Sequence, residues 1–249
     1  MIILKIGGSV ITKKTSPLCA REAEIHRISQ EIASFLSEDA DSLILVHGAG
    51  SFGHPQAMKY RFKEDAEGVY LIHKAVKTLN SMVVESLNKE GVRALPVHPL
   101  SSCILENSNI IDFQLENIRI MLELGIVPVL HGDVVMDKSK GIEILSGDRI
   151  ISYLADTMSA SKIGAGSDVD GVLDNRGELI KKITPLSFVD IKKHIYSTRD
   201  ATHGMLGKVN EFVELAKKGI DSRIFNASRK GMVSKFLYGE DVGTLIANK

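Results

Sequence analysis

Short apolar runs alternate with longer amphipathic stretches along this chain of 249 residues. The apolar runs have the length of buried β-strands and lie at residues 2–6, 42–46, 92–97, 126–130, 162–169 and 222–226. Helical spacing of apolar side chains predicts helices at residues 21–36, 68–89, 115–124, 146–158 and 204–218. Strands separated by helices are typical of parallel βαβ units with helices on both faces. We therefore predict a three-layer α/β/α sandwich with a mainly parallel central sheet.

One stretch breaks this alternation. Residues 134–145 place two apolar arms around a Lys-Ser-Lys-Gly turn, which predicts a β-hairpin. No internal repeat, low-complexity tract or linker interrupts the chain, so we expect a single domain over residues 1–249. In such sheets ligands bind outside the carboxyl ends of the strands, and the loops there are where candidate chemistry is expected.

The charge balance argues against a general polyanion binder. Lys plus Arg total 31 and Asp plus Glu total 31, so phosphate would have to be bound by local placement of charge. The N-terminus has no signal-peptide pattern, and no apolar run reaches the ~20 residues of a membrane span. The two cysteines, Cys19 and Cys103, form no CxxC pattern and are expected as thiols. We expect a cytoplasmic protein with neither nucleic acid nor membrane as a partner.

Two glycine-rich loops follow the first two predicted strands. The first reads Gly7-Gly8-Ser9, and the second runs from Gly48-Ala49-Gly50 to His54. Glycines allow backbone N–H groups to approach an anion because no Cβ intervenes. Either loop alone is weak evidence, because a glycine pair after a strand is more often just a tight turn. Two such loops on one sheet edge could hold two phosphates facing each other, as phosphoryl transfer requires.

The second loop also satisfies the dinucleotide fingerprint G-x-G-x-x-G. That fingerprint requires a helix that opens directly from the loop and an acidic residue about 20 residues on. Pro55 follows the loop closely and a polar stretch comes next, so we expect neither such a helix nor NAD binding. No Walker-type phosphate loop is present, because Gly207-Lys208 is followed by Val209.

Several charged residues lie near these loops. Lys5 sits inside an apolar strand, where a charge is costly unless it is paired or functional, although an edge lysine could reach solvent. Lys14 follows the first loop, and by itself would be a surface lysine. Asp148 lies at a predicted helix start. It is either simply a carboxylate that the helix dipole stabilises there, or a residue that orients lysines around a phosphoryl group. Asp133 follows His131-Gly132 and has a turn role as its simplest interpretation.

The histidines divide into three groups. His54, beside exposed N–H groups, could donate a hydrogen bond to an acceptor phosphate, or could be an ordinary loop histidine. His47 is expected to be structural. For His26, His73, His98 and His194 we expect no surrounding constellation.

The carboxyl-terminal third adds candidate nucleotide contacts. Asp168 lies at a strand end in Ser-Asp-Val-Asp-Gly-Val, and lacks the remaining positions of a calcium-binding loop. Gly204 and Lys208 lie at a predicted helix start, where a phosphate is attracted by the helix N-terminus and by the lysine.

Six motifs occur in an order typical of one family. They are LKIGGSVIT (4–12), VHGAGSFGHP (46–55), HGDVV (131–135), SGDRI (146–150), SDVDGV (167–172) and DATHGMLGK (200–208). Across nearly its whole length the sequence resembles the isopentenyl phosphate kinases of the amino acid kinase superfamily. GAGSFGH, which carries His54, is the most specific of these motifs.

The resemblance implies ATP-dependent phosphorylation of isopentenyl phosphate to the diphosphate, in the alternate mevalonate pathway of isoprenoid biosynthesis. The implied ATP-binding residues are Lys5, Gly7, Gly8, Ser9, Gly50, Asp168, Gly204 and Lys208, with Lys5, Lys14, His54 and Asp148 as the catalytic group. Ala49, His54 and Gly147 would bind the acceptor. It further implies Mg²⁺ carried with ATP, a homodimer, an acceptor-binding lobe at about 1–160 and a nucleotide-binding lobe at about 161–249.

Two positions depart from the family pattern. Ser167 stands where the family often has Thr and keeps the hydroxyl, and His203 stands where the family usually has Gly, beside the predicted nucleotide turn. An apolar pocket for the acceptor tail would be lined from the helix at 68–89 by Tyr70, Val76, Leu79 and Val83, unless these are ordinary core. A phosphonate kinase similar to fosfomycin kinase and a non-catalytic nucleotide sensor on the same fold are the alternative functions.

Overall fold

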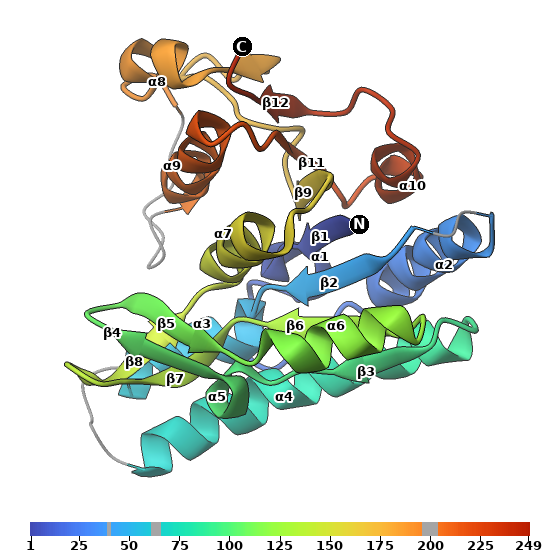
Figure 1. The fold of residues 1–249 in the computed structure, drawn as a ribbon, viewed down its shortest axis with the longest axis vertical. Helices are drawn as coiled ribbons and strands as arrows, with labels where there is room; N and C mark the ends of the chain where they lie inside the picture. The colour runs from blue at the N-terminus through green and yellow to red at the C-terminus, as the bar shows by residue number, and fades with distance from the viewer. Residues whose placement is uncertain (39–40, 61–65, 196–203) are drawn as a thin grey trace.

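The central feature of the fold is one sheet of eight strands (Figure 1). The computed structural model describes residues 1–38, 41–60, 66–195 and 204–249, without the side chains of residues 54, 56 and 58–60. The strand order is β10-β12-β11-β9-β1-β2-β6-β3. The strands are β1 Ile2–Ile6, β2 Leu43–His47, β3 Ala94–Pro96, β6 Val127–His131, β9 Lys162–Ser167, β10 Lys182–Ile183, β11 Ser222–Asn226 and β12 Thr244–Ile246. Only β11 and β12 pair antiparallel, so the predicted mainly parallel sheet is confirmed.

Strand β1 shows why the apolar runs form the centre of the sheet. All five of its residues are buried, because it has a parallel neighbour on each side and helices on both faces. Successive side chains point to opposite faces. Ile2 and Leu4 join the apolar cluster on one face, whereas Ile3 joins the cluster on the other. Lys5 has the same parity as Ile3 and therefore points to the second face.

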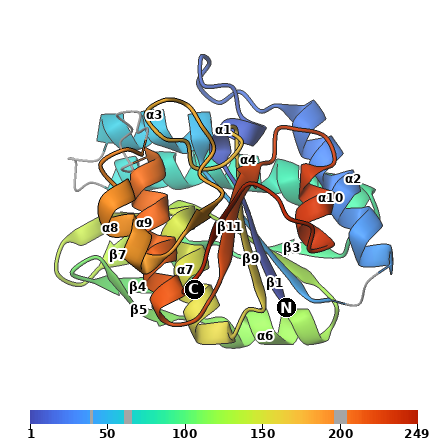
Figure 2. The ribbon, with the colours of Figure 1, turned by 90° about the horizontal axis from the view of Figure 1, so that it is seen from above.

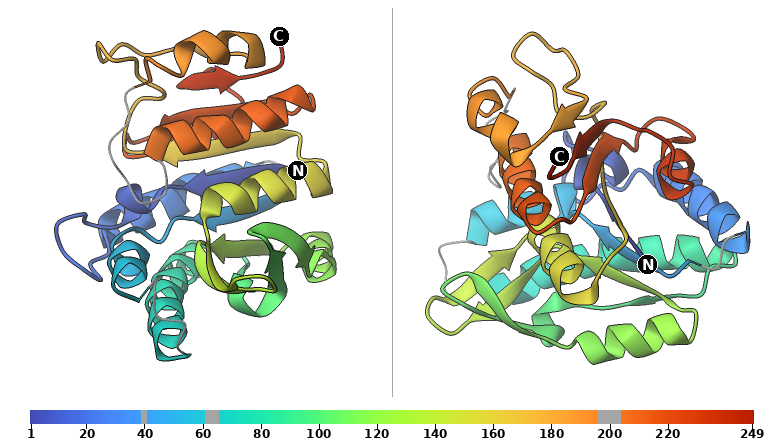
Figure 3. Two further views of the ribbon diagram at one scale, coloured as in Figure 1. Left: turned by 90° about the vertical axis from the view of Figure 1, so that its left-hand side faces the viewer. Right: turned by 45° about the horizontal axis from the view of Figure 1, so that its top comes forward.

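Helices cover both faces of the sheet (Figure 2). One face is covered by α2 Glu22–Glu38, α4 Ala66–Lys89 and α10 Met232–Leu237, and the other by α6 Leu115–Glu123, α7 Gly147–Met158 and α9 Gly204–Lys217. Figure 3 shows α7 and α9, in yellow and orange, lying along the sheet on the same side. The five predicted helices are thus confirmed as α2, α4, α6, α7 and α9, whereas the six-residue α10 was not predicted. The three layers give the predicted α/β/α sandwich.

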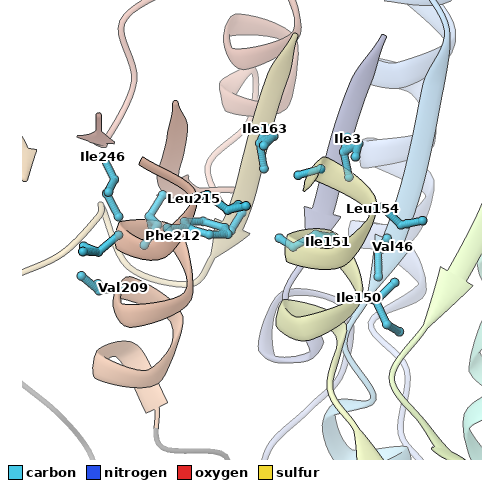
Figure 4. Packing of buried hydrophobic residues seen from close by; sticks show 14 of the residues in the cluster. Ile3, Val46, Ile150, Ile151, Leu154, Ile163, Val209, Phe212, Leu215 and Ile246 are labelled. Carbon is cyan, nitrogen blue, oxygen red and sulfur yellow. The ribbon is translucent and has the colours of Figure 1, made fainter. Parts of the chain in front are cut away.

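The face under α7 and α9 is packed with branched apolar side chains (Figure 4). Ile150, Ile151 and Leu154 of α7 are fully buried, as are Val209 and Phe212 of α9. Burying a side chain of this kind stabilises the fold by roughly 1.5–3 kcal/mol. Both helices begin at the carboxyl end of the sheet. This packing therefore fixes the position of their first turns, which carry Asp148 and Lys208.

A second, four-stranded sheet in the order β5-β4-β7-β8 lies beside the first. Its strands are β4 Cys103–Glu106, β5 Asn109–Phe113, β7 Asp133–Asp137 and β8 Gly141–Leu145. The predicted hairpin is confirmed as β7 and β8, which pair antiparallel. The hairpin of β4 and β5 was not predicted, because its turn, Asn107-Ser108, lacks glycine although both residues have positive φ.

A helix that the sequence argued against opens directly from the second glycine loop. Helix α3, Gly50–Tyr60, contains Pro55, so the expectation of no such helix was wrong. Proline has no N–H to donate to the carbonyl four residues earlier, which is that of Ser51. The N–H of Leu18 donates to that carbonyl over 3.2 Å, which compensates for the lost bond. Helix α4, not a strand, is the next described element, so the rest of the dinucleotide pattern is not met.

Three shorter helices complete the described structure. They are α1 Gly8–Ile11, α5 Pro99–Ser102 and α8 Pro185–Ile191. Each is too short to show an apolar periodicity, which explains why the sequence did not predict them. Among the described helices, none combines the length and the apolar character needed to span a membrane.

Candidate functional site

The two glycine loops touch at the carboxyl ends of neighbouring strands β1 and β2. A Cβ built on Gly8 would lie 2.3 Å from the backbone nitrogen of Gly50, and one built on Gly48 would lie 2.6 Å from the nitrogen of Gly8. Gly50 also has a positive φ of 49°. Glycine is therefore required because backbone packs directly against backbone, in addition to any role in binding.

Free backbone N–H groups gather at this contact. Among the described residues, nothing accepts a hydrogen bond from the backbone N–H of Gly8, Ser9, Ala49 or Gly50. The N–H of Gly7 differs, because it donates to the carbonyl of Gly166 on β9 over 2.7 Å. Unpaired N–H groups that converge from two loops favour anions, and phosphate oxygens in particular.

Lys5, Asp148 and Lys208 form a buried charge cluster beside the loops. The ammonium of Lys5 lies 2.6 Å from Asp148 Oδ1, and that of Lys208 lies 3.9 Å from the same oxygen. Burial lowers the pKa of Lys5 to about 8, although Asp148 partly opposes this effect. Burial alone would raise the pKa of Asp148, but the charges of Lys208 and Lys5 outweigh it, and the pKa is lowered. Asp148 therefore stays ionised and holds two lysines together.

Gly147 connects this cluster to the loops. A Cβ there would lie 3.2 Å from Lys5 Cε and 3.4 Å from the carbonyl oxygen of His47. Gly147 is the first residue of α7, whose N-cap Ser146 accepts a hydrogen bond from the N–H of Arg149. The start of α7 thus lies against both Lys5 and the end of β2.

Lys14 lies apart from Lys5 and pairs with Asp168. The two charged groups are 2.9 Å apart, and the Lys14 side chain is 72% exposed. Burial would raise the pKa of Asp168, but Lys14 and a hydrogen bond from Ser9 hold the pKa below its usual value. Asp168 follows β9, so this second cluster lies on the side of the β1 loop that faces the carboxyl-terminal strands.

Two predicted positions have only partial descriptions. His54 lies in α3, and its side chain is outside the described part of the molecule. Gly204 begins α9 with a φ of +56°, one turn before Lys208, and His203 lies outside the described residues.

The tail-pocket residues of α4 are mainly core: Val76, Leu79 and Val83 are buried, and only Tyr70 is exposed.

The sequence missed a network of histidines at the ends of β2 and β6. His73 and His98, for which no constellation was expected, belong to it, so that expectation was wrong. His98 Nδ1 lies 2.9 Å from His131 Nε2, and His73 Nδ1 lies 3.0 Å from Asp133 Oδ2. The ring of His47 stacks on that of His131, with centroids 5.6 Å apart. A usable signal was present, because β2 and β6 each end in the dipeptide His-Gly.

Both His-Gly pairs make the same local bond. Nδ1 of His47 lies 3.1 Å from the carbonyl of Gly48, and Nδ1 of His131 lies 3.0 Å from the carbonyl of Gly132. A carbonyl only accepts, so both Nδ1 atoms carry the proton and donate. Nε2 of His47 then accepts from the Asn80 amide, 3.1 Å away.

Three histidines of this network are uncharged at neutral pH. Burial lowers the pKa of His47 to about 3 and that of His98 to about 4, and also lowers the pKa of His131. Asp133, predicted as a turn residue, accepts hydrogen bonds from the backbone N–H groups of Val134 and Leu100 as well as contacting His73. It therefore joins the start of β7 to α4 and α5.

Known proteins share this architecture over their full length. The amino acid kinase family matches residues 1–226. The chain is 37% identical to the isopentenyl phosphate kinase of Methanothermobacter thermautotrophicus, with 100% of both chains covered. It is also 37% identical to that of Haloferax volcanii, with 99% of this chain and 98% of the relative covered.

Solved structures agree with these sequence matches. An X-ray structure of isopentenyl phosphate kinase superposes with a TM-score of 0.86 at 35% identity, covering 99% of this chain and 100% of the other. The Thermoplasma acidophilum isopentenyl phosphate kinase product complex superposes with a TM-score of 0.78 at 25% identity, covering 99% of each chain. The chain therefore belongs to the amino acid kinase family and, within it, to the group of isopentenyl phosphate kinases.

Proposed function

We propose that this protein transfers the γ-phosphoryl group of ATP to isopentenyl phosphate and releases isopentenyl diphosphate and ADP. The observation that carries this proposal is the contact of two glycine loops whose free N–H groups converge beside the Lys5–Asp148–Lys208 cluster. The names of the full-length relatives support the choice of acceptor.

The residues divide between the two substrates. We assign the ATP phosphates to the N–H groups of Gly8, Ser9 and Gly50, with Gly7 shaping the loop. Asp168, Gly204 and Lys208 would contact the nucleotide. Ala49, Gly147 and His54 would hold the acceptor phosphate, supported by the position of Gly147 between Lys5 and the end of β2.

The transfer needs no general base. An oxygen of the ionised acceptor phosphate attacks the γ-phosphorus, a new P–O bond forms, and the bond to the β-phosphate oxygen breaks with its electron pair leaving on ADP. Lys5 and Lys14 would neutralise the charge of the moving group, and Asp148 would hold Lys5 and Lys208 in place. Lys14 would have to turn from Asp168 toward the phosphates.

Mg²⁺ fits this arrangement as a companion of ATP. The described part of the chain contains no cluster of three or more histidine, cysteine or acidic side chains that could hold a metal ion. Asp148 and Asp168 are each engaged by lysines. We propose that ATP oxygens and water supply the ligands of the ion. The ion would offset the negative charge of the phosphates.

Three finer properties belong to the same proposal. We assign acceptor binding to a lobe at about 1–160 and nucleotide binding to a lobe at about 161–249. Full-length variants with substitutions in one lobe or the other, each titrated with ATP, would test this division. Leu95 on edge strand β3, Ile120 on α6 and Leu124 directly after α6 are exposed, which supports a homodimer testable by light scattering. Both cysteines are free thiols, which supports a cytoplasmic location testable by cell fractionation.

The direct test is an acceptor screen. Purified protein is incubated with Mg-ATP and isopentenyl phosphate, and isopentenyl diphosphate and ADP are measured by mass spectrometry. Dimethylallyl phosphate, fosfomycin and acetylglutamate run in parallel. Lys5→Met, which keeps the side-chain length without the charge, controls for contaminating kinases and should lose nearly all turnover. Turnover of fosfomycin alone would favour a phosphonate kinase, and ATP binding without any turnover would favour a nucleotide sensor.

A further inference from the structure

A single buried hydroxyl connects the two glycine loops. Thr12 directly follows α1, and only 1% of its surface is exposed. Its Oγ1 donates to the carbonyl of Gly8 over 2.7 Å and accepts from the N–H of Ser51 over 3.0 Å. The hydroxyl thus bonds the first loop on one side and the start of α3 on the other, and both of its hydrogen-bonding directions are used.

The Ser51 N–H depends on this contact. Ser51 is the second residue of α3, where a backbone N–H has no acceptor within the helix. Ser51 is itself buried. Thr12 therefore serves α3 as a cap supplied by a different loop. Without an oxygen at this position, the N–H would have to find another partner by a shift of the helix start.

The hydroxyl lies where the loops are closest. A Cβ on Gly50 would lie 2.2 Å from Thr12 Oγ1 and 2.8 Å from the carbonyl oxygen of Gly8. Figure 2 shows α1 and α3 beside each other at one end of the molecule. The free N–H groups of Gly8 and Ser9 belong to the loop that Thr12 bonds through the Gly8 carbonyl, and those of Ala49 and Gly50 directly precede Ser51, which donates to Thr12.

We propose that Thr12 is a positioning residue that sets the distance between the donor phosphates and the acceptor phosphate. This inference rests on the proposed function. Reacting atoms have to approach within about 3–3.5 Å, and a misplacement of about 1 Å can cost on the order of 10²-fold in rate. Thr12 touches neither substrate. It holds the two loops that bind them at a fixed separation.

The test compares Thr12→Val, which keeps the shape but removes the hydroxyl, with Thr12→Ser, which keeps the hydroxyl but removes the methyl group. We expect Thr12→Val to lower kcat at least tenfold, with the Kd of ATP alone changed less than threefold. Thr12→Ser should keep kcat within about twofold of the wild type. A kcat for Thr12→Val within threefold of wild type, or an equal loss in Thr12→Ser, overturns the role of the hydroxyl.

Two further measurements keep the outcome unambiguous. A loss of kcat matched by an equal loss of ATP affinity and of Tm would indicate a purely structural role and also overturn the proposal. If Thr12→Val does not fold, Thr12→Ser and Thr12→Cys make the same comparison without the buried methyl group, and Thr12→Cys should be the slower. Absence of turnover in the wild type would contradict the proposed function, whereas an unimpaired Thr12→Val beside an active wild type contradicts only this inference.

Discussion

Neighbouring strands β2 and β6 each end in a histidine that is followed by a glycine, but the chain continues differently after the two. His47-Gly48 and His131-Gly132 both place a buried imidazole on the carbonyl of the following glycine. After β2 the chain packs against the first glycine loop and enters α3 with unpaired N–H groups. After β6 the chain continues into β7, where Asp133 is fully bonded. The same local device thus supports a candidate binding loop in one place and a structural junction in the other.

The largest expected effect comes from one added methyl group at Gly48, compared with the same change at Gly132. A Cβ on Gly48 would lie 2.6 Å from the nitrogen of Gly8, whereas the nearest atom to a Cβ on Gly132 is 3.4 Å away. Gly48→Ala forces the loops apart, so we expect turnover to fall by about 10²-fold or more. Gly132→Ala should stay within about threefold, because its contacts are ordinary van der Waals distances. Steady-state kinetics would decide, and equal losses in both variants would contradict the distinction.

The two carboxylates near these strand ends should separate activity from stability. Asp148→Asn removes the charge between Lys5 and Lys208, and we expect kcat to fall about 10²-fold. Asp133→Asn removes acceptor capacity from a fully buried group, and we expect about 1–3 kcal/mol less unfolding free energy with kcat nearly unchanged. Kinetics and urea denaturation of both variants make the comparison. The reverse pattern, a stable and inactive Asp133→Asn, would place the chemistry at β6.

The same two variants should also differ in the alkaline limb of the pH–activity profile. The pKa of Lys5 is about 8, so its charge is present below that pH and is lost as the pH rises through it. Wild-type kcat/KM should therefore decline above about pH 8. Without the Asp148 carboxylate the pKa of Lys5 falls further, so the decline of the residual activity should begin at lower pH in Asp148→Asn and stay in place in Asp133→Asn. An unshifted limb in Asp148→Asn would remove Lys5 as its cause.

The last expected effect is on stability alone and concerns the buried histidine that β2 and β6 share. The pKa of His47 is about 3 in the folded protein, lowered mainly by burial from an ordinary value near 6.5. The unfolded chain takes up protons below about pH 6.5 that the folded chain refuses, so stability should fall as the pH drops from 6.5 toward 3, by at most about 1.4 kcal/mol per pH unit for one such group.

His98 and His131 should add to this acid sensitivity, since their pKa values are also lowered. Urea denaturation at about pH 7.5, 6 and 5 would measure the slope. His26→Gln, which removes an exposed histidine of α2 that lies 3.2 Å from Glu90, controls for the loss of a histidine outside the network. A stability that is flat from pH 7 to 5 would show that these histidines are not held neutral.

Local patterns carried most of the fold prediction. The buried strands and amphipathic helices were predictable because their periodicity reflects which face is buried, and α7 and α9 were placed within a residue or two. Pattern failed at α3, which contains Pro55 and in which the carbonyl of Ser51 accepts instead from the N–H of Leu18, a residue far from it along the chain. It also failed at β4 and β5, whose turn uses Asn107 and Ser108 in a conformation more typical of glycine.

Local sequence made Lys5, Asp148 and Lys208 candidates. A charge inside an apolar strand is costly, which draws attention to Lys5, and Asp148 and Lys208 lie at predicted helix starts. Only the tertiary structure decided that both lysines converge on one oxygen of Asp148, that Lys14 pairs instead with Asp168, and that four histidines form a network. These contacts join residues that are far apart along the chain. Periodicity records only which face is buried, whereas the strand order, which no periodicity encodes, brings these side chains together.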